Sequence, residues 1–352
     1  MSLVEAPDDL SELNEWVVEQ RWSDGLPIVP PTRERVDEML QGTSWPADTV
    51  IGLVPPRNAE ATVDKIAANA VMAGCTPSAM PILIAAVQAM LEPQVNLYGA
   101  QATTHPCAVM VMVTGPVARA AGVHGGAGLF GPGFPANATI GRAVRLIQQN
   151  LGGAWPGETD RATQGTPAKF TFCFGENEEE SPWDPYRVQR GFASDESTVT
   201  VVAAEGPHNL NDHVSSDARG VLFTFAQTMA TIGTNNAYCT DADLVLVMCP
   251  EHAKVVADAG FTPADVRQYL YERARIPYRE WKLGGMYGML DQPRHLDAAD
   301  DDYPVAILET PDDIHLVIGG GPGRHSAWIP TIGVGRAAVR VIAEPDGTPV
   351  RA

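Results

Sequence analysis

The sequence predicts an α/β fold made of two pseudo-equivalent halves, with sheets that are mainly parallel or mixed. Near-continuous apolar runs, such as residues 109–113 and 244–248, alternate with helix-like segments, a pattern typical of strands covered on both faces. Several phrases of the chain occur twice in the same order, which indicates an internal duplication. The 352 residues are 45% hydrophobic and 19% charged, as in ordinary globular proteins.

The duplication depends on four pairs of phrases. In the strongest pair, residues 131–147 and residues 321–342 both contain Gly-Pro-Gly, then Thr-Ile-Gly, then Arg and Ala before an apolar helical pattern. The weaker pairs are 87–90 with 226–229, 109–113 with 244–248, and 50–58 with 199–209. The alternative is that glycine- and proline-rich loops of α/β proteins resemble one another by composition alone.

The order of elements predicts four segments. Residues 1–49 form an N-terminal helical arm, with one helix around 10–21 and a second after Pro30 and Pro31. The first half spans 50–151, and a connecting segment, 152–197, includes a strand candidate at 169–174. The second half spans 198–352 and contains an insertion, 263–303, with an amphipathic helix at 264–275.

Charge and cysteine usage limit the classes of function. The net charge of −19 argues against nucleic-acid binding, because it repels phosphate backbones. No apolar run is long enough for a membrane span, and the acidic N-terminus does not resemble a signal peptide, so we expect a cytoplasmic protein. Five scattered cysteines without a CxxC pair suit free thiols in a reducing compartment. Acid-rich stretches such as 312–313 are interpreted as solvated loop surface.

Two glycine loops, the first at residues 125–133 and the second at residues 319–326, are the first candidates for ligand binding. Glycine lets backbone N–H groups approach a ligand closely, and a helix N-terminus favours an anion. We therefore expect a carboxylate or phosphate of a small substrate to bind there; the alternative is tight turns that pack a helix onto a sheet. Arg324, His325 and Ser326 follow one another in the second loop and favour the functional interpretation. The predicted substrate-binding residues of these loops are Gly131, Gly133, Asn137, Gly321, Gly323, Arg324 and Ser326.

Cys75 and His105 are candidate catalytic groups, together with His325. Cys75 lies just before Pro77, where a helix N-terminus would lower the pKa of its thiol; the alternative is a small apolar residue at a helix junction. His105 precedes the run 109–113 and suits a general base or a metal ligand. Cys107, at the entrance of that run, is interpreted as a buried structural thiol.

Polar residues near the ends of predicted strands extend the site. His208, Asn209 and His213 follow the run 199–203, and the repeat matches His208 and Asn209 with Arg57 and Asn58. Because ligands of α/β sheets bind at the carboxyl ends of strands, Glu176 is predicted to be catalytic and Asn177 to bind substrate. His124, beside the first glycine loop, is a lesser candidate. Three other histidines are interpreted as helix or surface residues: His252, His295 and His315.

Several phrases resemble a bacterial family known mostly from uncharacterised members, which we associate with selenocysteine- or cysteine-containing proteins of the UGSC type. The phrases are RWSDGLPIVPPT, NAVMAGCTPS, GPGFPANATIGRA, GENEEESPW and GGGPGRHSAW, and the resemblance covers most of the chain. It implies thiol or redox chemistry and assigns no catalytic residue.

Three hypotheses of function follow. The first is a lyase or hydrolase that acts on a small anionic molecule between the halves, using a cysteine and histidine with anion-binding glycine loops and no evident cofactor. The second is a metalloenzyme that holds a divalent metal with histidines. The third is a non-catalytic ligand-binding or redox-partner protein. In the second hypothesis the candidate metal ligands are His105, His208, His213 and His325. All three hypotheses are compatible with a homo-oligomer.

Overall fold

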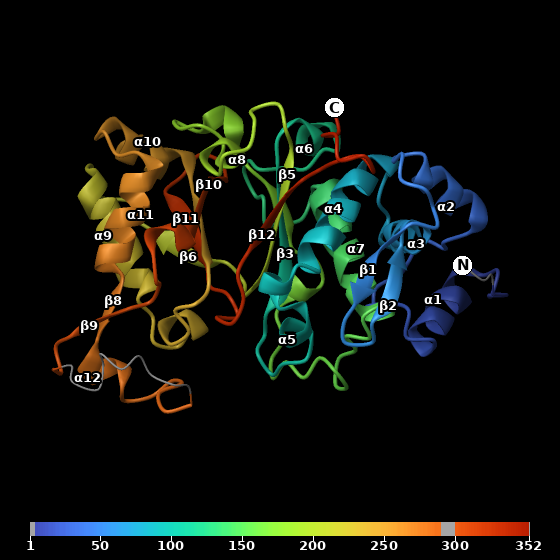
Figure 1. Ribbon diagram of the computed structural model, residues 1–352, viewed down its shortest axis with the longest axis horizontal. Coiled ribbons are helices and arrows are strands. Elements are labelled where there is room, and N and C mark those ends of the chain that lie inside the picture. Colours follow the sequence, from blue (N-terminus) through green and yellow to red (C-terminus); the bar gives the residue numbers. More distant parts are fainter. Residues whose placement is uncertain (1–3, 290–299, 352) are drawn as a thin grey trace.

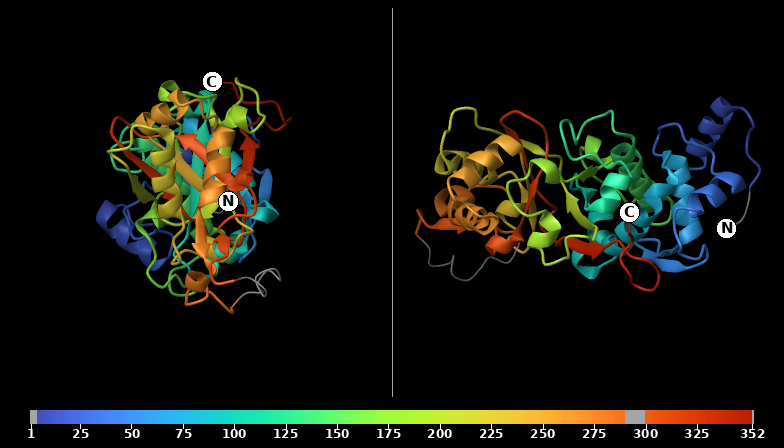
Figure 2. Two further views of the ribbon diagram at one scale, coloured as in Figure 1. Left: turned by 90° about the vertical axis from the view of Figure 1, so that its left-hand side faces the viewer. Right: turned by 90° about the horizontal axis from the view of Figure 1, so that it is seen from above.

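The predicted α/β class is confirmed by the arrangement of helices and mixed sheets in a computed structural model, which describes residues 4–289 and 300–351. Within these residues, two four-stranded sheets pack face to face, and helices cover the outer face of each (Figure 1). The view from above shows the same succession of layers along the long axis (Figure 2).

The first sheet has the order β12-β5-β3-β4. Its centre is the antiparallel pair of β3 (Ala108–Thr114) and β5 (Thr198–Ala204), in which every residue is buried. The outer strands are β4 (Cys173–Gly175), parallel to β3, and β12 (Ala338–Val341), antiparallel to β5. Burial on both faces explains why the central strands are continuous apolar runs.

The second sheet has the order β10-β7-β11-β6 and repeats the same directions. The strand β7 (Leu244–Met248) is parallel to β10 (Ile314–Ile318) and antiparallel to β11 (His325–Ile329). The edge strand β6 (His208–Asn211) is antiparallel to β11. Mixed sheets are therefore confirmed, with antiparallel pairing at the centre of both.

A shared apolar layer joins the two sheets. Met110, Met112 and Phe174 from the first sheet belong to one buried cluster with Val247 and Ile329 from the second. The inner faces of both sheets therefore form one core, which binds the halves together.

Helices complete the outer layers. Those over the first sheet are α3 (Val63–Ala73), α4 (Met80–Met90), α5 (Leu97–Gln101), α6 (Pro116–Ala120) and α7 (Pro135–Asn150). Those on the side of the second sheet are α8 (Tyr186–Gln189), α9 (Ala218–Met229), α10 (Pro250–Asp258), α11 (Pro263–Arg273) and α12 (Tyr278–Trp281), with the strand pair β8 (Arg275–Pro277) and β9 (Pro304–Ala306). The predicted helix at 264–275 is thus confirmed as α11.

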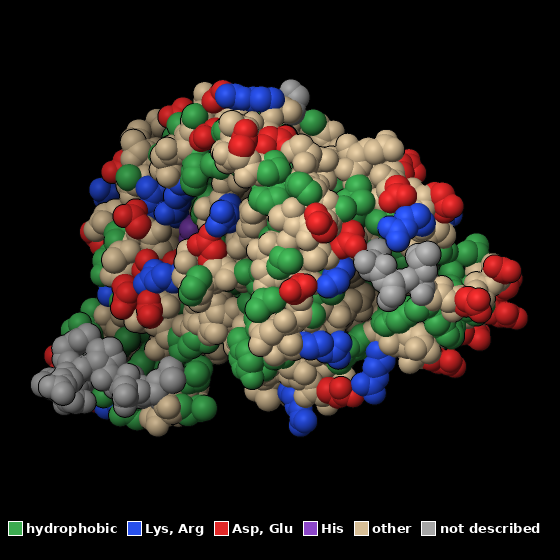
Figure 3. Space-filling view, turned by 45° about the vertical axis from the view of Figure 1, so that its right-hand side comes forward, with side chains coloured by type: hydrophobic (Ala, Val, Ile, Leu, Met, Phe, Trp, Pro, Cys, Tyr) green, Lys and Arg blue, Asp and Glu red, His purple; other side chains and the backbone are tan. Residues whose placement is uncertain are grey.

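The N-terminal arm lies beyond the first helical layer (Figure 1). It consists of α1 (Leu10–Glu19) and α2 (Arg33–Leu40), which begins after the Thr32 cap, and is followed by the hairpin of β1 (Val50–Val54) and β2 (Ala59–Thr62). Both predicted helices of the arm are confirmed. The space-filling view shows acidic side chains gathered at this end of the molecule (Figure 3). No helix among the described residues is long and apolar enough to cross a membrane.

The chain crosses between the sheets twice. It passes from β5 in the first sheet to β6 in the second, and from β11 back to β12 in the first. The first sheet therefore takes β5 and β12 from the segment 198–352 that was expected to form the second half. The first sheet thus combines strands from both sides of the expected boundary, whereas the second sheet takes all four of its strands from residues 198–352.

The structure contradicts two of the four repeat pairs. Residues 135–147 are part of the helix α7, whereas the matched residues form the strands β11 and β12. Residues 50–54 form one strand of a small hairpin, whereas 199–204 lie in the centre of the first sheet. The other two pairs do join equivalent elements, α4 with α9 and β3 with β7. The duplication itself stays a prediction.

The connecting segment also differs from expectation. The strand candidate 169–174 was placed too early, because Pro167–Lys169 forms a short 3-10 helix and β4 begins at Cys173. Residues 290–299 of the expected insertion, which include His295, lie outside the described residues.

Candidate functional site

A cavity of about 400 Å³ lies between the sheets, beneath the first glycine loop. Strands β7, β11 and β6 contribute to its wall, and Leu129 and Phe130 reach it from the loop. Of the predicted site residues, Asn209, His325 and Ser326 line it. The lining residues are Leu129, Phe130, Pro207, Asn209, Val247, Gly319, Gly320, His325, Ser326 and Ala327.

Two histidines meet at this cavity. The Nε2 atoms of His213 and His325 are 3.2 Å apart, and the ring centroids are separated by 4.9 Å. Nδ1 of His325 lies 3.0 Å from Oδ1 of Asn209. Because the amide oxygen accepts a hydrogen bond, it holds the proton of His325 on Nδ1 and leaves the Nε2 lone pair directed to His213.

Strand register explains this arrangement. β6 and β11 pair antiparallel, with Ala327 opposite Asn209 and His325 opposite Asn211. Side chains alternate along a strand, so His325 and Ala327 share one face with Asn209, whereas Ser326 points to the opposite face. His213 follows the end of β6 and folds back over the same face.

Ser326 therefore does not offer its hydroxyl to the cavity, contrary to the predicted substrate-binding role. Its buried Oγ accepts the N–H of Cys249 at 2.9 Å and donates to Nδ1 of His252 at 2.8 Å. Nε2 of His252 donates to the carbonyl of Asp212 at 2.9 Å. Burial lowers the pKa of His252, so the ring is neutral. His252 was interpreted as a helix or surface residue; it lies in the helix α10 and is fully buried.

The side chain of Asp212, whose carbonyl accepts the hydrogen bond from His252, fixes the turn that follows β6. It accepts the N–H groups of Val214 and Ser215 and the hydroxyls of Ser215 and Thr224. Burial acts to raise the pKa of Asp212, but these hydrogen bonds outweigh it and lower the pKa to about 2. The turn that carries His213 is therefore fixed at its base.

The glycine loops bind each other rather than an open anion site. The Gly320 N–H donates to the Gly125 carbonyl at 2.9 Å, and the Gly323 N–H donates to Glu251 Oε1 at 2.8 Å. A Cβ added at Gly321 would lie 2.5 Å from the Cβ of Ala127. The glycines at 320 and 321 thus allow close packing of two loops, which favours the tight-turn alternative. Gly131 and Gly133 lie in the exposed part of the first loop.

Other residues predicted to bind substrate have structural partners. Asn137 is buried and accepts the N–H of His124, while its Nδ2 donates to the carbonyls of His124 and Leu129. Asn177 links the two sheets: its backbone N–H donates to the carbonyl of Ile318, and its side-chain Nδ2 donates to the carbonyl of Gly320. Both side chains hold the loops that border the cavity.

Arg324 is also engaged. Its Nη1 donates to the Ser215 carbonyl at 2.7 Å, and its Nε lies 3.7 Å from Glu251 Oε2. Both partners belong to the second half, so the guanidinium ties the loop to its own surroundings. It is not among the residues that line the cavity.

Two further catalytic candidates, Cys75 and His105, lie elsewhere. Burial raises the pKa of Cys75 to about 12, opposite to the expected direction, because its thiol packs in the helical layer of the first half. Cys75 is therefore poorly suited to act as a thiolate nucleophile. His105 pairs with Glu205, with 3.0 Å between Nε2 and Oε1. As expected, Cys107 is buried.

Arg57 and Asn58 do not share a face with His208 and Asn209, contrary to expectation. They form the turn of the β1–β2 hairpin, beyond the helices of the first half, whereas β6 is the edge strand of the second sheet (Figure 1). His208 is exposed on β6 and points to the face opposite Asn209. Of the four histidines proposed as metal ligands, His213 and His325 lie next to each other in the described part of the chain.

Glu176 lies at the seam of the two sheets, directly after β4. Its Oε1 accepts the Tyr186 N–H at 2.8 Å, and its Oε2 is buried without a hydrogen-bond partner among the described residues. Burial raises the pKa of Glu176 to about 8; Glu178 adds to the shift and Arg187 opposes it. The side chain is therefore protonated at neutral pH, but it does not line the inter-sheet cavity.

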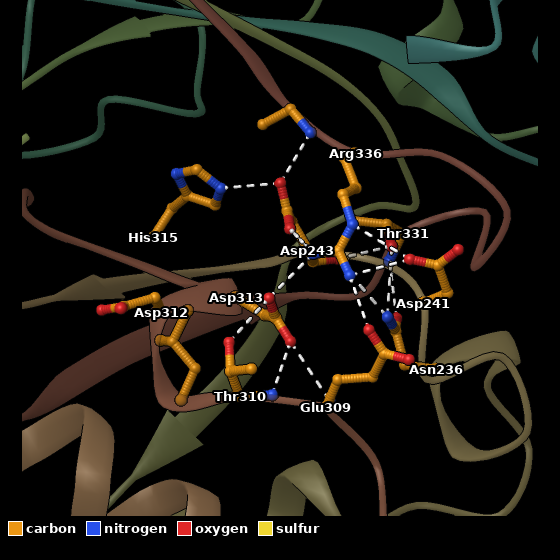
Figure 4. Close-up of polar contacts among 12 residues, drawn as sticks. Asn236, Asp241, Asp243, Glu309, Thr310, Asp312, Asp313, His315, Thr331 and Arg336 are labelled. Atoms are coloured by element: carbon orange, nitrogen blue, oxygen red, sulfur yellow. Dashed lines mark hydrogen bonds and ion pairs between the residues drawn. The ribbon is translucent and has the colours of Figure 1, made fainter. Parts of the chain in front are cut away.

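The densest charged cluster was missed by the sequence analysis. Arg336, on the connection from β11 to β12, donates to the carboxylates of Asp241, Asp243, Glu309 and Asp313 (Figure 4). These partners bind both edges of the guanidinium, so we interpret the cluster as a structural clamp. The hydrogen bond with Asp313 is the main cause that raises the pKa of Arg336. Asp313 was interpreted as solvated loop surface and is instead buried.

A buried relay continues from this clamp. Nε2 of His315 donates to Asp243 at 3.0 Å, and the Tyr186 hydroxyl lies 2.6 Å from Nδ1 of His315. Burial lowers the pKa of His315, so it is neutral, with its proton on Nε2 and Nδ1 accepting from Tyr186. The interpretation of His315 as a helix or surface residue was wrong.

No family model, curated protein or solved structure matches this chain.

Proposed function

We propose that this protein is an enzyme of the lyase or hydrolase type, which acts on a small molecule in the inter-sheet cavity. The observation that carries the proposal is the paired histidine site: Nε2 of His325 lies 3.2 Å from Nε2 of His213, and Asn209 orients the His325 ring. A base held in one orientation by a third group is the arrangement that proton-transfer catalysis requires.

In this mechanism His325 is the general base. Its Nε2 takes a proton from a substrate or water molecule that displaces the exposed His213 ring from this nitrogen, while Nδ1–H stays bonded to Asn209. The same Nε2 then returns that proton to the leaving group, so that the ring ends the cycle neutral. His213 is exposed and exchanges protons between the pair and solvent.

The cavity suits a small molecule with a largely apolar body. Leu129, Phe130 and Val247 line it beside the polar groups of Asn209 and His325, and its ten described lining residues include no Lys or Arg. A carboxylate or phosphate of the substrate would therefore meet the polar groups of Asn209 and His325 rather than Arg324, which does not line the cavity.

A substrate screen with matched variants tests this proposal. Purified protein is assayed against small esters, amides and hydroxy acids, and any turnover is compared in the wild type, H325A, N209A and H208A. We expect H325A to abolish turnover and N209A to lower kcat more than it raises KM, because Asn209 orients the base. H208A is the control, since His208 points to the other face of β6. Turnover that survives in H325A would refute the proposal.

The second candidate function is a metalloenzyme that uses the same pair. Two nitrogen ligands about 2.0–2.1 Å from a tetrahedral Zn²⁺ lie roughly 3.3 Å apart, close to the observed 3.2 Å. Metal-binding histidines usually donate their other N–H to a fixed acceptor, as His325 does to Asn209. Metal analysis of wild type and H213A separates the candidates: one divalent metal per chain, absent from H213A, would replace the metal-free mechanism.

A further inference from the structure

A second cavity, of about 700 Å³, lies between the N-terminal arm and the segment that follows α7. Ser23 and Asp24 from the arm and Arg145 from α7 line one part of it, and residues 155–170 line the rest. None of its lining residues belongs to the histidine site.

A buried group of charges lies in this cavity. Asp160 is 6% exposed and accepts hydrogen bonds from Lys169 Nζ at 2.6 and 2.7 Å and from Arg145 Nη2 at 3.2 Å. The side chains of Arg145 and Lys169 are 11% and 14% exposed. All three groups are thus largely removed from solvent, where uncompensated charge is costly.

The charges leave an excess of one positive charge. Arg145 and Lys169 are two cations that share the single carboxylate of Asp160. The other acid of the lining, Asp24, is already neutralised by Arg142, which binds it through Nε at 2.9 Å and Nη2 at 2.8 Å. Neither Nε nor Nη1 of Arg145 donates to another described residue, so this guanidinium has capacity for a further acceptor.

Apolar side chains form the remaining wall. Trp155, Pro156, Pro167 and Phe170 line the cavity, and Phe170 is 48% exposed although it is a large hydrophobic residue. Aromatic and proline surfaces beside fixed cations suit a flat apolar body that carries one acidic group. A monoanion balances the excess charge, whereas a phosphate dianion would exceed it.

We infer that this cavity is a second ligand site, which binds a small carboxylate with an apolar, ring-sized body. The carboxylate meets Lys169 and Arg145 beside Asp160, and the body lies against Trp155 and Phe170. The site is independent of the proposed catalytic histidines, so either proposal can fail without the other.

Calorimetric titration of the full-length protein with benzoate, acetate and inorganic phosphate tests the inference. We expect benzoate to bind more tightly than acetate or phosphate. K169M should weaken benzoate binding at least about tenfold, because it removes the excess charge. D160N should strengthen it severalfold, because it removes the competing carboxylate while keeping the side-chain shape.

K254M is the matched control, because Lys254 is an exposed lysine, with 73% side-chain exposure, on α10. Loss of one positive charge there should leave benzoate binding unchanged. Wild-type protein that binds none of the probes, equal affinities in K169M and K254M, or weaker binding in D160N would each overturn the inference. D160N keeps the test decisive if K169M fails to fold.

Discussion

The carboxyl group of Glu176 is unusual because one of its oxygens is buried without a partner among the described residues. Burial of this kind favours the protonated form. The sequence located the residue correctly at the end of a strand, since β4 ends at Gly175. It did not reveal that the side chain would be neutral, because that depends on Tyr186 and on loops from other parts of the chain.

The first prediction is that E176Q removes a pH dependence of stability. The pKa of Glu176 is about 8 in the folded protein and near 4.5 when unfolded, so between these values the folded state binds more protons. The contribution of Glu176 to the free energy of unfolding is full below pH 4.5 and is lost as the pH rises through 8, by about 3–4 kcal/mol between pH 5 and pH 8. Urea unfolding of wild type and E176Q at pH 5 to 8 measures the difference. Parallel curves for the two proteins would contradict it.

The second prediction contrasts two adjacent residues of β11. S326A leaves the Nδ1 of His252 and the N–H of Cys249 buried without their partner, so it should destabilise the fold by about 1–3 kcal/mol. H325A removes an exposed side chain on the opposite face and should change stability little. Thermal unfolding of both variants checks this. A larger loss in H325A than in S326A would show that the strand faces are assigned wrongly.

Helices and strands show how far sequence patterns reach. The arm helices, α11 and the central strands β3 and β7 were predicted because each depends on local periodicity or on continuous apolar runs. The phrase with Thr-Ile-Gly and Arg does not mark equivalent elements. In one copy Pro135 starts a helix, whereas in the other the chain pairs with β7 and β6 and becomes a strand. Tertiary pairing decided the second case, and short phrases do not encode it.

The third prediction concerns the docking of the N-terminal arm. Asp24 binds Arg142 of α7 through two hydrogen bonds, and the two side chains are 4% and 14% exposed. D24A should leave the guanidinium without its buried partner, destabilise the protein by about 3 kcal/mol and increase proteolysis within the arm. Urea unfolding and limited proteolysis measure both effects. R21A is the control, since Arg21 pairs with Glu158 on the surface and its loss should have no measurable effect.

At the scale of the whole molecule, the two halves are interlocked rather than placed side by side. The two crossing connections give the first sheet β5 and β12, and the inner faces of both sheets share one core. Sequence order suggested separate halves because it shows which segments follow one another, not which sheet each strand enters. The same limit hid the Arg336 clamp, whose hydrogen-bonded partners are 23 to 95 residues away along the chain. The pairing of His213 with His325 spans 112 residues and could only be proposed as one of several combinations.

The clamp supports the last prediction, because it holds the second crossing connection against the starts of β7 and β10. R336M leaves Asp243 and Asp313 buried without their cation and should cost about 2–3 kcal/mol at pH 7, allowing for the one-third exposure of Arg336.

Burial opposes ionisation of Asp243, but hydrogen bonds from His315 and Ala337 and the charge of Arg336 lower its pKa. The stability that Asp243 contributes is therefore present above pH 4 and is lost as the pH falls through its folded-state pKa. The cost of R336M should shrink over the same range, since a protonated Asp243 no longer needs the cation. Urea unfolding of wild type, R336M and the exposed control R351M at pH 7 and pH 3.5 tests this. A cost of R336M that is unchanged at acid pH would show that Arg336 acts through packing rather than charge.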